Sequence, residues 1–254
     1  MTDYILEAHD LTKSFGGFVA VNGVNLRIQR GSIHAIIGPN GAGKTTMFNL
    51  LTKFIAPTSG KILFNGKDIT KWKPAEIATQ GIVRSFQISA VFPHLTALEN
   101  VRLALQTRLG VSYQFWRSKK VLNELDAEAL TRLDQVGLKE YAHLRAVELP
   151  YGRKRALEIA TTLGLEPELM LLDEPTQGMG AEDVGSVTGL ISRVREGRTI
   201  VMVEHNLGVV AELADTITVL ARGEVLAEGP YEEVSRNPLV MEAYMGVAAE
   251  EAEA

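Results

Sequence analysis

The stretch that decides the fold is Gly38-Pro39-Asn40-Gly41-Ala42-Gly43-Lys44-Thr45. It has the Gly-x-x-x-x-Gly-Lys-Thr spacing of a phosphate-binding loop, the P-loop. Glycines let the backbone turn its N–H groups toward phosphate oxygens, and the dipole of a following helix adds positive potential. Lys44 is expected to reach the β- and γ-phosphates, and the Thr45 hydroxyl to bind Mg²⁺. The predicted ATP-binding residues are Gly38, Asn40, Gly41, Ala42, Gly43, Lys44, Thr45 and Thr46.

The residues on either side of this loop supply the context that it requires. Residues 33–37 are an unbroken apolar run typical of a buried strand. A helical pattern follows the loop and is predicted to run to about Lys53. The alternative is a glycine-rich turn that carries a lysine by chance. The strand before the loop and the helix after it favour the phosphate-binding interpretation.

The remaining chain alternates between strand and helix patterns. Strands are predicted at residues 5–8, 24–28, 61–64, 169–172, 199–203, 216–220 and 224–227. Residues 74–144 are predicted to be mainly helical, with helices at 97–109 and 119–136. This order predicts an α/β P-loop core with a mostly parallel sheet and an antiparallel N-terminal β subdomain. We expect one domain over 1–247 with a helical subdomain inserted at about 88–160, followed by an acidic tail at 248–254.

The composition excludes several classes of function. The net charge of −5 carries none of the basic excess that a nucleic-acid surface shows, so no nucleic-acid partner is expected. The chain has no cysteine, which excludes disulfides, thiolate metal ligands and a cysteine nucleophile. No apolar run approaches the roughly 18 residues of a membrane span, and the first residues lack a secretory pattern.

Two carboxylates follow the apolar run 169–172, and a histidine follows the run 199–203. A buried strand would deliver Asp173 and Glu174 to the edge of the sheet where α/β proteins bind ligands. One acid can orient Mg²⁺ through water and the other can polarise an attacking water. His205 would reach the same edge as Lys44. The alternatives are a solvated strand-end acid and an inert strand-end histidine. The Gln87 amide could contact both metal and water, or be an ordinary turn residue.

Together and in this order, the motifs resemble those of the ABC-transporter ATPases, over a match from Leu6 to about Gly246. The resemblance implies that Phe15 stacks on adenine and that Gln87 binds Mg²⁺ and senses a membrane partner. It implies that Glu174 is the catalytic glutamate and His205 the switch histidine. The implied metal ligands are Thr45, Gln87 and Asp173.

The family's signature segment corresponds to Leu149-Pro150-Tyr151-Gly152-Arg153-Lys154-Arg155. The family usually has Ser where this chain has Pro150 and Gln where it has Arg153. In the family, that Ser and the Gly contact the γ-phosphate bound by the opposite subunit. Pro150 has neither a hydroxyl nor an N–H, but Gly152 and the start of a helix can still offer N–H groups. The alternative is that Tyr151 and Gly152 merely begin a helix.

A second departure follows Glu174. The family usually has Asp or Asn where this chain has Gly180, and that side chain helps to couple the two sites of a dimer. Gly180 cannot do so, and Glu182 or Asp183 are the candidates to replace it.

Three segments, 15–22, 81–87 and 237–246, resemble the branch that powers branched-chain amino-acid importers. The insertion from Leu105 to about Leu122 also fits that branch, and its Tyr113, Phe115 and Trp116 either dock a membrane partner or pack the helical subdomain. Lipopolysaccharide-export ATPases and urea or short-chain amide importers are similar and stay open as alternatives.

The resemblance implies an ATP hydrolase that uses ATP and Mg²⁺ and pairs as a homodimer or with a related ATPase subunit. It implies integral-membrane permease subunits, an indirect link to a periplasmic or extracellular substrate-binding protein, and a peripheral position on the cytoplasmic face of the inner membrane. The rivals are a soluble ABC ATPase acting on DNA or ribosomes and a P-loop kinase. The chain lacks the long coiled coils or the second cassette of the soluble ABC ATPases. A P-loop kinase does not explain Gln87, Gly152 and His205 together.

Overall fold

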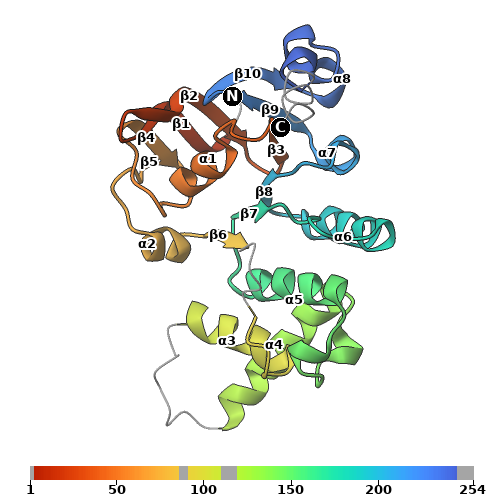
Figure 1. Cartoon of the computed structure of the whole chain (residues 1–254). Helices are drawn as coiled ribbons and strands as arrows, with labels where there is room; N and C mark the ends of the chain where they lie inside the picture. The colour runs from red at the N-terminus through yellow and green to blue at the C-terminus, as the bar shows by residue number, and fades with distance from the viewer. Residues whose placement is uncertain (1–2, 86–90, 110–118, 245–254) are drawn as a thin grey trace.

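The computed structural model describes residues 3–85, 91–109 and 119–244. Within these residues the strands form two sheets (Figure 1). The smaller sheet is antiparallel, with the order β2 (Phe18–Gln29), β1 (Tyr4–Phe15), β4 (Ser59–Phe64) and β5 (Lys67–Asp68). The Gly16-Gly17 turn joins β1 to β2, and both glycines have positive φ. This sheet confirms the predicted antiparallel N-terminal subdomain.

The larger sheet is parallel except at one edge. Its order is β10 (Glu224–Gly229), β9 (Thr216–Ala221), β3 (Ile33–Ile37), β8 (Thr199–Val203), β7 (Leu169–Asp173) and β6 (Ile82–Ser85). Only β10 runs antiparallel to its neighbour among these described strands. Because β3, β8 and β7 lie side by side, the residues that follow each of them meet at one edge of the sheet.

Both faces of this parallel sheet are covered, which explains the unbroken apolar runs. In β3, Ile33, Ala35 and Ile37 belong to one buried cluster, which includes residues of helices α3 to α7. Ile36 points the other way, into a cluster with α1 and the antiparallel sheet. Alternate strand residues face opposite sides, so a strand covered on both sides needs apolar residues at every position.

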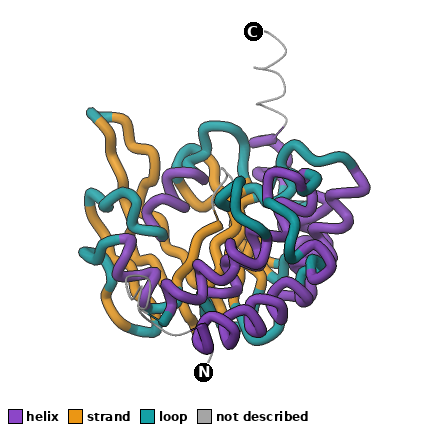
Figure 2. The backbone as a smooth tube through the Cα atoms, turned by 90° about the horizontal axis from the view of Figure 1, so that it is seen from below, coloured by secondary structure: helices purple, strands orange, loops and turns teal. Residues whose placement is uncertain are grey.

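Helices pack around the parallel sheet, and a group of them forms one end of the molecule. They are α1 (Lys44–Leu51), α2 (Pro74–Thr79), α3 (Ala97–Arg108), α4 (Lys119–Gln135), α5 (Tyr151–Gly164), α6 (Ala181–Val194), α7 (Leu207–Leu213) and α8 (Tyr231–Val234), with 3₁₀ turns η1 (Lys139–Tyr141) and η2 (Ala146–Glu148). Helices α3, α4 and α5 lie together at the end of the molecule farthest from the antiparallel sheet (Figure 1). Figure 2 shows most strands on one side and most helices on the other. No helix within the described ranges is long and apolar enough to cross a membrane.

The predicted α/β class is confirmed, but the structure has one strand inside the range that was predicted to be mainly helical. Residues 74–144 were expected to be mainly helical, but residues 82–85 form β6, which pairs with β7. The strand has only four residues and carries Arg84, so its apolar pattern is too short to separate it from a helix. Helix α1 also ends at Leu51 rather than Lys53.

Several predictions fall on residues that the structure does not describe. Gln87 lies outside the described ranges, as do Tyr113, Phe115, Trp116 and the acidic tail 248–254. The predicted start of the helical subdomain, residue 88, lies outside them too, so the subdomain boundaries stay a prediction.

Candidate active site

The loop between β3 and α1 needs glycine at two positions. At Gly38, with φ of 150°, a Cβ atom would lie 2.1 Å from the carbonyl oxygen of Leu220. At Gly43, with φ of 99°, it would lie 2.4 Å from the carbonyl oxygen of Ala20. The buried strand β3 therefore ends in a loop whose backbone has no room for a Cβ atom at Gly38 or Gly43. Helix α1 begins directly after it at Lys44, with Thr45 and Thr46 on its first turn.

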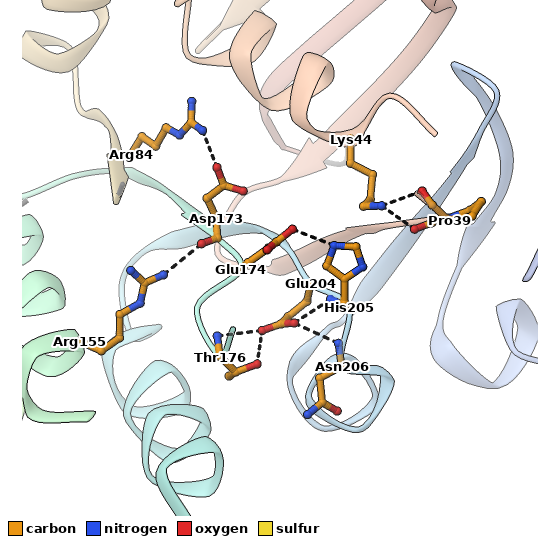
Figure 3. A network of polar contacts seen from close by, with 11 residues as sticks. Pro39, Lys44, Arg84, Arg155, Asp173, Glu174, Thr176, Glu204, His205 and Asn206 are labelled. Atoms are coloured by element: carbon orange, nitrogen blue, oxygen red, sulfur yellow. Dashed lines mark hydrogen bonds and ion pairs between the residues drawn. The ribbon is translucent and has the colours of Figure 1, made fainter. Parts of the chain in front are cut away.

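The Lys44 side chain lies along this loop. Its Nζ donates hydrogen bonds to the carbonyl oxygens of Gly38 (2.6 Å) and Pro39 (2.8 Å), as Figure 3 shows. Burial lowers the pKa of the Lys44 amine, and the nearby Glu174 carboxylate opposes this shift. The Lys44 amine thus lies between the loop and Glu174, where its positive charge could pair with a bound phosphate group.

Asp173 and Glu174 end β7 side by side but have different partners. The Asp173 carboxylate accepts a 2.5 Å hydrogen bond from Nη2 of Arg84, and its backbone carbonyl accepts one from Arg155 (3.1 Å). Arg84 also donates to the Asn49 amide oxygen of α1 at 2.6 Å. Both Arg84 and Asp173 have mostly buried side chains. This pair joins β6, β7 and α1 beneath the site.

Glu174 faces His205. Its Oε1 lies 2.8 Å from Nε2 of His205, and its N–H donates to the Val203 carbonyl at 2.9 Å. Glu174 has a φ of 46°, which is uncommon for a residue other than glycine. The Glu174 side chain is 12% exposed and that of His205 is 46% exposed. The acid is therefore enclosed while the histidine reaches solvent.

A cavity of about 380 Å³ connects the phosphate loop to these strand ends. It is lined by Asn40, Glu174, Thr176, Gln177, Met179, Val184, Glu204, His205 and Asn206. A carboxylate, an imidazole and the phosphate loop converge on this space. The arrangement suits placement of a water molecule against a phosphate.

Of the signature segment, Arg155 reaches the Asp173 carbonyl, whereas Pro150, Gly152 and Arg153 lie elsewhere. Pro150 is the N-cap of α5, and Tyr151 is exposed, with its hydroxyl donating to the Gln177 carbonyl at 3.2 Å. The Arg153 guanidinium lies 4.0 Å from the ring centre of Tyr141. Three of these residues, Pro150, Gly152 and Arg153, line a separate cavity of about 470 Å³. The structure does not bring them to the Glu174–His205 pair of the same chain.

The other two predicted positions are peripheral. Phe15 ends β1, is 47% exposed, and has the Lys13 amine 4.9 Å from its ring centre. Gly180 is the N-cap of α6. Asp183, in the first turn of that helix, lies against Gly152: a Cβ atom added at Gly152 would be 2.6 Å from the Asp183 Oδ1. Asp183 thus joins the segment after Glu174 to the start of α5.

Sequence reasoning missed three polar residues that support the site. They are Arg84, Arg155 and Glu204, each with hydrogen bonds into the segments around Asp173 and His205 (Figure 3). For Arg84 and Glu204 the available signal was a charged residue inside or directly after an apolar strand, whereas Arg155 lies in helix α5 and had no such signal. That signal does not identify a partner, because the partner comes from another part of the chain.

The fold and the site define a P-loop ATPase. The chain belongs to the ABC transporter family, whose model matches residues 21–177, and a model described as branched-chain amino acid ATP-binding cassette transporter matches residues 224–250. It is thus a nucleotide-binding, ATP-hydrolysing subunit of a transporter system. The family assignment and the larger sheet's mixed topology agree with the predicted class.

Full-length relatives and solved structures support this assignment. The chain is 38% identical to the high-affinity branched-chain amino acid transport ATP-binding protein BraF of Pseudomonas aeruginosa, over 98% of this chain and 100% of BraF. It resembles the ADP conformation of the ATP-binding cassette MJ1267, with a TM-score of 0.84 and 30% identity over 96% of this chain and 100% of that one. It also resembles the dimeric post-hydrolysis structure of the cassette MJ0796 bound to ADP and Pi, with a TM-score of 0.74 and 28% identity over 89% of this chain and 98% of that one. Cassettes of this family dimerise and work with membrane permease components.

Proposed function

We propose that the chain powers import of branched-chain or related amino acids. The observation that carries the substrate class is the C-terminal match at residues 224–250, together with full-length similarity to BraF. The observation that carries the catalytic role is the 2.8 Å contact between Glu174 and His205 beside the phosphate loop. A lipopolysaccharide-export-type or urea/amide-type system is the alternative for the transported compound.

In the proposed reaction Glu174 positions the attacking water and His205 orients Glu174 and the γ-phosphate. Lys44 stabilises negative charge on the phosphates. Its amine already donates to the carbonyl oxygens of Gly38 and Pro39, and phosphate oxygens would replace these acceptors. Phe15 is exposed at the end of β1, where it would offer its ring to the adenine base.

The oxygen donors at this edge fit Mg²⁺. We propose that the Thr45 hydroxyl, on the first turn of α1, and the Asp173 carboxylate, at the end of β7, hold it together with Gln87. Mg²⁺ prefers a few protein oxygens, phosphate oxygens and water, which matches this donor set. When bound, it would neutralise charge on the phosphates. Because Arg84 already pairs with Asp173, a water-mediated contact suits this carboxylate.

We propose a head-to-tail pair, either a homodimer or a heterodimer with a related ATPase. Pro150, Gly152 and Arg153 line a cavity separate from the one at Glu174 and His205, which supports a role toward ATP bound by the opposite subunit. Pro150 offers no N–H, so the contact would come from Gly152 and the first turn of α5. The solved dimer of MJ0796 supports pairing in a similar cassette.

We propose that a permease docks between the parallel sheet and the helical subdomain of residues 88–160, inside a single ATPase domain over 1–247. A mostly apolar cavity of about 450 Å³ lies there, lined by residues of α2, β6, α3 and α5. Phe54 and Phe92 line it and are half-exposed or more. The chain would then be peripheral on the cytoplasmic face, with a substrate-binding protein linked only through the permease.

The experiment is a pull-down from the native host. The Glu174→Gln variant is trapped with Mg-ATP, gently solubilised, and its co-purifying proteins are identified, with Lys44→Ala as the matched variant that should not form the trapped complex. An amino-acid-importer permease would support the proposal. A lipopolysaccharide-export or urea/amide permease would correct the substrate class. Repeated recovery of ribosomal or DNA-bound proteins alone would contradict the importer.

A further inference from the structure

Glu204 is a buried carboxylate that the proposed reaction does not use. It directly follows β8, precedes His205 and is 3% exposed. Its Oε1 accepts a 3.0 Å hydrogen bond from the Thr176 N–H and a short one from the Thr176 hydroxyl. Its Oε2 accepts hydrogen bonds from the N–H groups of His205 (2.7 Å) and Asn206 (3.0 Å). Figure 3 shows Glu204 between the two segments that carry Glu174 and His205.

The end of the parallel sheet creates the need for this carboxylate. The β7–β8 pairing ends at Asp173 and Val203, with one further hydrogen bond from the Glu174 N–H to Val203. Beyond this point the segments that follow β7 and β8 separate, and their backbone N–H groups near the buried edge need other acceptors. An ionised carboxylate can accept hydrogen bonds from several donors. The Glu204 side chain therefore takes over from the β7–β8 backbone hydrogen bonds and bridges the two segments.

The bridge is more than a helix cap. Helix α7 has its own N-cap, because the Asn206 side chain accepts from the N–H groups of Gly208 (3.0 Å) and Val209 (3.4 Å). One oxygen of Glu204 is committed to Thr176, which lies two residues after Glu174. The other oxygen holds the backbone of His205 itself. The contact therefore sets the spacing between the two residues of the proposed catalytic pair.

We propose that Glu204 is a positioning residue for ATP hydrolysis, holding the Glu174 carboxylate and the His205 ring in mutual contact. This inference rests on the proposed roles of Glu174 and His205. A carboxylate is required because all four groups facing it can donate. A glutamine of the same shape would turn an NH₂ group toward backbone donors and leave them without acceptors.

The test compares kcat with ATP affinity in the full chain. Glu204→Gln is expected to lower kcat by about 10- to 100-fold, because small misplacements of reacting groups have effects of that size. The Kd for Mg-ATP should stay within about threefold, because Lys44 and the loop are untouched. Thr176→Val removes one of the four donors and should lower kcat by a smaller factor. Thr176→Ser, which keeps the hydroxyl, should recover most of that loss.

Glu212→Gln is the control, because it removes an equal charge from an exposed position on α7. The proposal is overturned if both Glu204→Gln and Thr176→Val keep kcat within about twofold of the parent. It is also overturned if Kd rises in step with the fall in kcat, since the bridge would then support the whole pocket. Thr176→Val alone decides the matter should Glu204→Gln not fold. Glu174→Gln is measured alongside, and its normal turnover would refute the proposed function itself.

Discussion

Two consecutive acids at the end of β7 are held in different ways. Asp173 points to Arg84, and Glu174 points to His205. Successive strand residues face opposite sides, and the positive φ of Glu174 turns the chain away from the strand directly after Asp173. The same carboxylate chemistry is therefore divided between a buried ion pair and a group that faces the cavity.

This division makes Glu174 the sensitive position. We expect Glu174→Gln to keep the Kd for Mg-ATP within about threefold and to lower kcat by about 10²- to 10⁴-fold, because the amide cannot act as a general base. Phosphate release and equilibrium binding measure the two quantities. Glu196→Gln, at an exposed position after α6, is the control and should leave both unchanged. Normal phosphate release by Glu174→Gln would contradict the assignment.

Lys44 should act on binding instead. Lys44→Ala removes the amine that donates to the Gly38 and Pro39 carbonyls, and with it the counter-charge for phosphate. Hydrogen bonds to charged groups contribute about 1.5–3 kcal/mol, so the Kd for ATP should rise by about 10- to 100-fold. Titration calorimetry measures the change, with the exposed Lys71→Ala as control. An unchanged Kd would show that Lys44 does not contact the phosphates.

At the scale of the elements, the phosphate loop depends on neighbours that are distant in sequence. The carbonyl of Ala20, in β2, approaches both Gly43 and Gly223. The Gly223 N–H donates to the Ala42 carbonyl at 3.0 Å, and the Asn22 N–H donates to the Gly223 carbonyl at 2.8 Å. The antiparallel sheet and the β9–β10 turn therefore hold the loop in shape.

Gly43→Ala should disturb this packing. The new Cβ would meet the Ala20 carbonyl oxygen at 2.4 Å in a backbone conformation with φ of 99°. We expect the free energy of unfolding to fall by about 1–3 kcal/mol, as measured by urea denaturation.

Gly185→Ala is the matched change, because a Cβ there has open space within α6. It should raise the free energy of unfolding by about 0.5–1 kcal/mol. Equal effects of the two variants would mean that the loop does not need a glycine at Gly43.

At the scale of the whole molecule, a chain of polar contacts runs from the buried His34 of β3 across β9 to the edge strand β10. His34 of β3 lies 2.7 Å from the Thr218 hydroxyl of β9, which donates to the Glu228 carboxylate of β10 at 2.7 Å. Since the single hydroxyl proton goes to Glu228, His34 donates through its Nε2–H. Burial lowers the pKa of His34 from 6.5 to about 4, so the ring is neutral at pH 7.

This histidine makes stability depend on pH. Its stabilising contribution is complete above about pH 6.5, and it is lost as the pH falls toward 4, because the unfolded chain binds the proton first. At pH 5 the loss is about 2 kcal/mol relative to pH 7. Urea denaturation should show this loss in the parent and a smaller one in His34→Gln, which does not titrate. His143→Gln, at an exposed position, should behave like the parent.

The elements and the site differ in how far the chain alone predicts them. The phosphate loop, β3, β8 and the helix at 97–108 were predicted almost to the residue, because their patterns are local. The strand β6 was missed, because only its pairing with β7 distinguishes it. Arg84 and Glu204 were missed as supporting residues, because hydrogen-bond partners distant in sequence leave no local pattern.

The order of residues was sufficient to predict a P-loop ATPase, since loop spacing, strand periodicity and the acid pair act over a few residues each. The ABC type came from the resemblance of the motifs, taken together and in their order, to that family. The order of residues also predicted that His205 would reach the edge that carries Glu174. The folded chain alone decided which groups touch: Asp173 with Arg84, Glu174 with His205, and Glu204 with Thr176. These contacts form because packing brings neighbouring strand ends to one buried edge, where every polar group must find a partner.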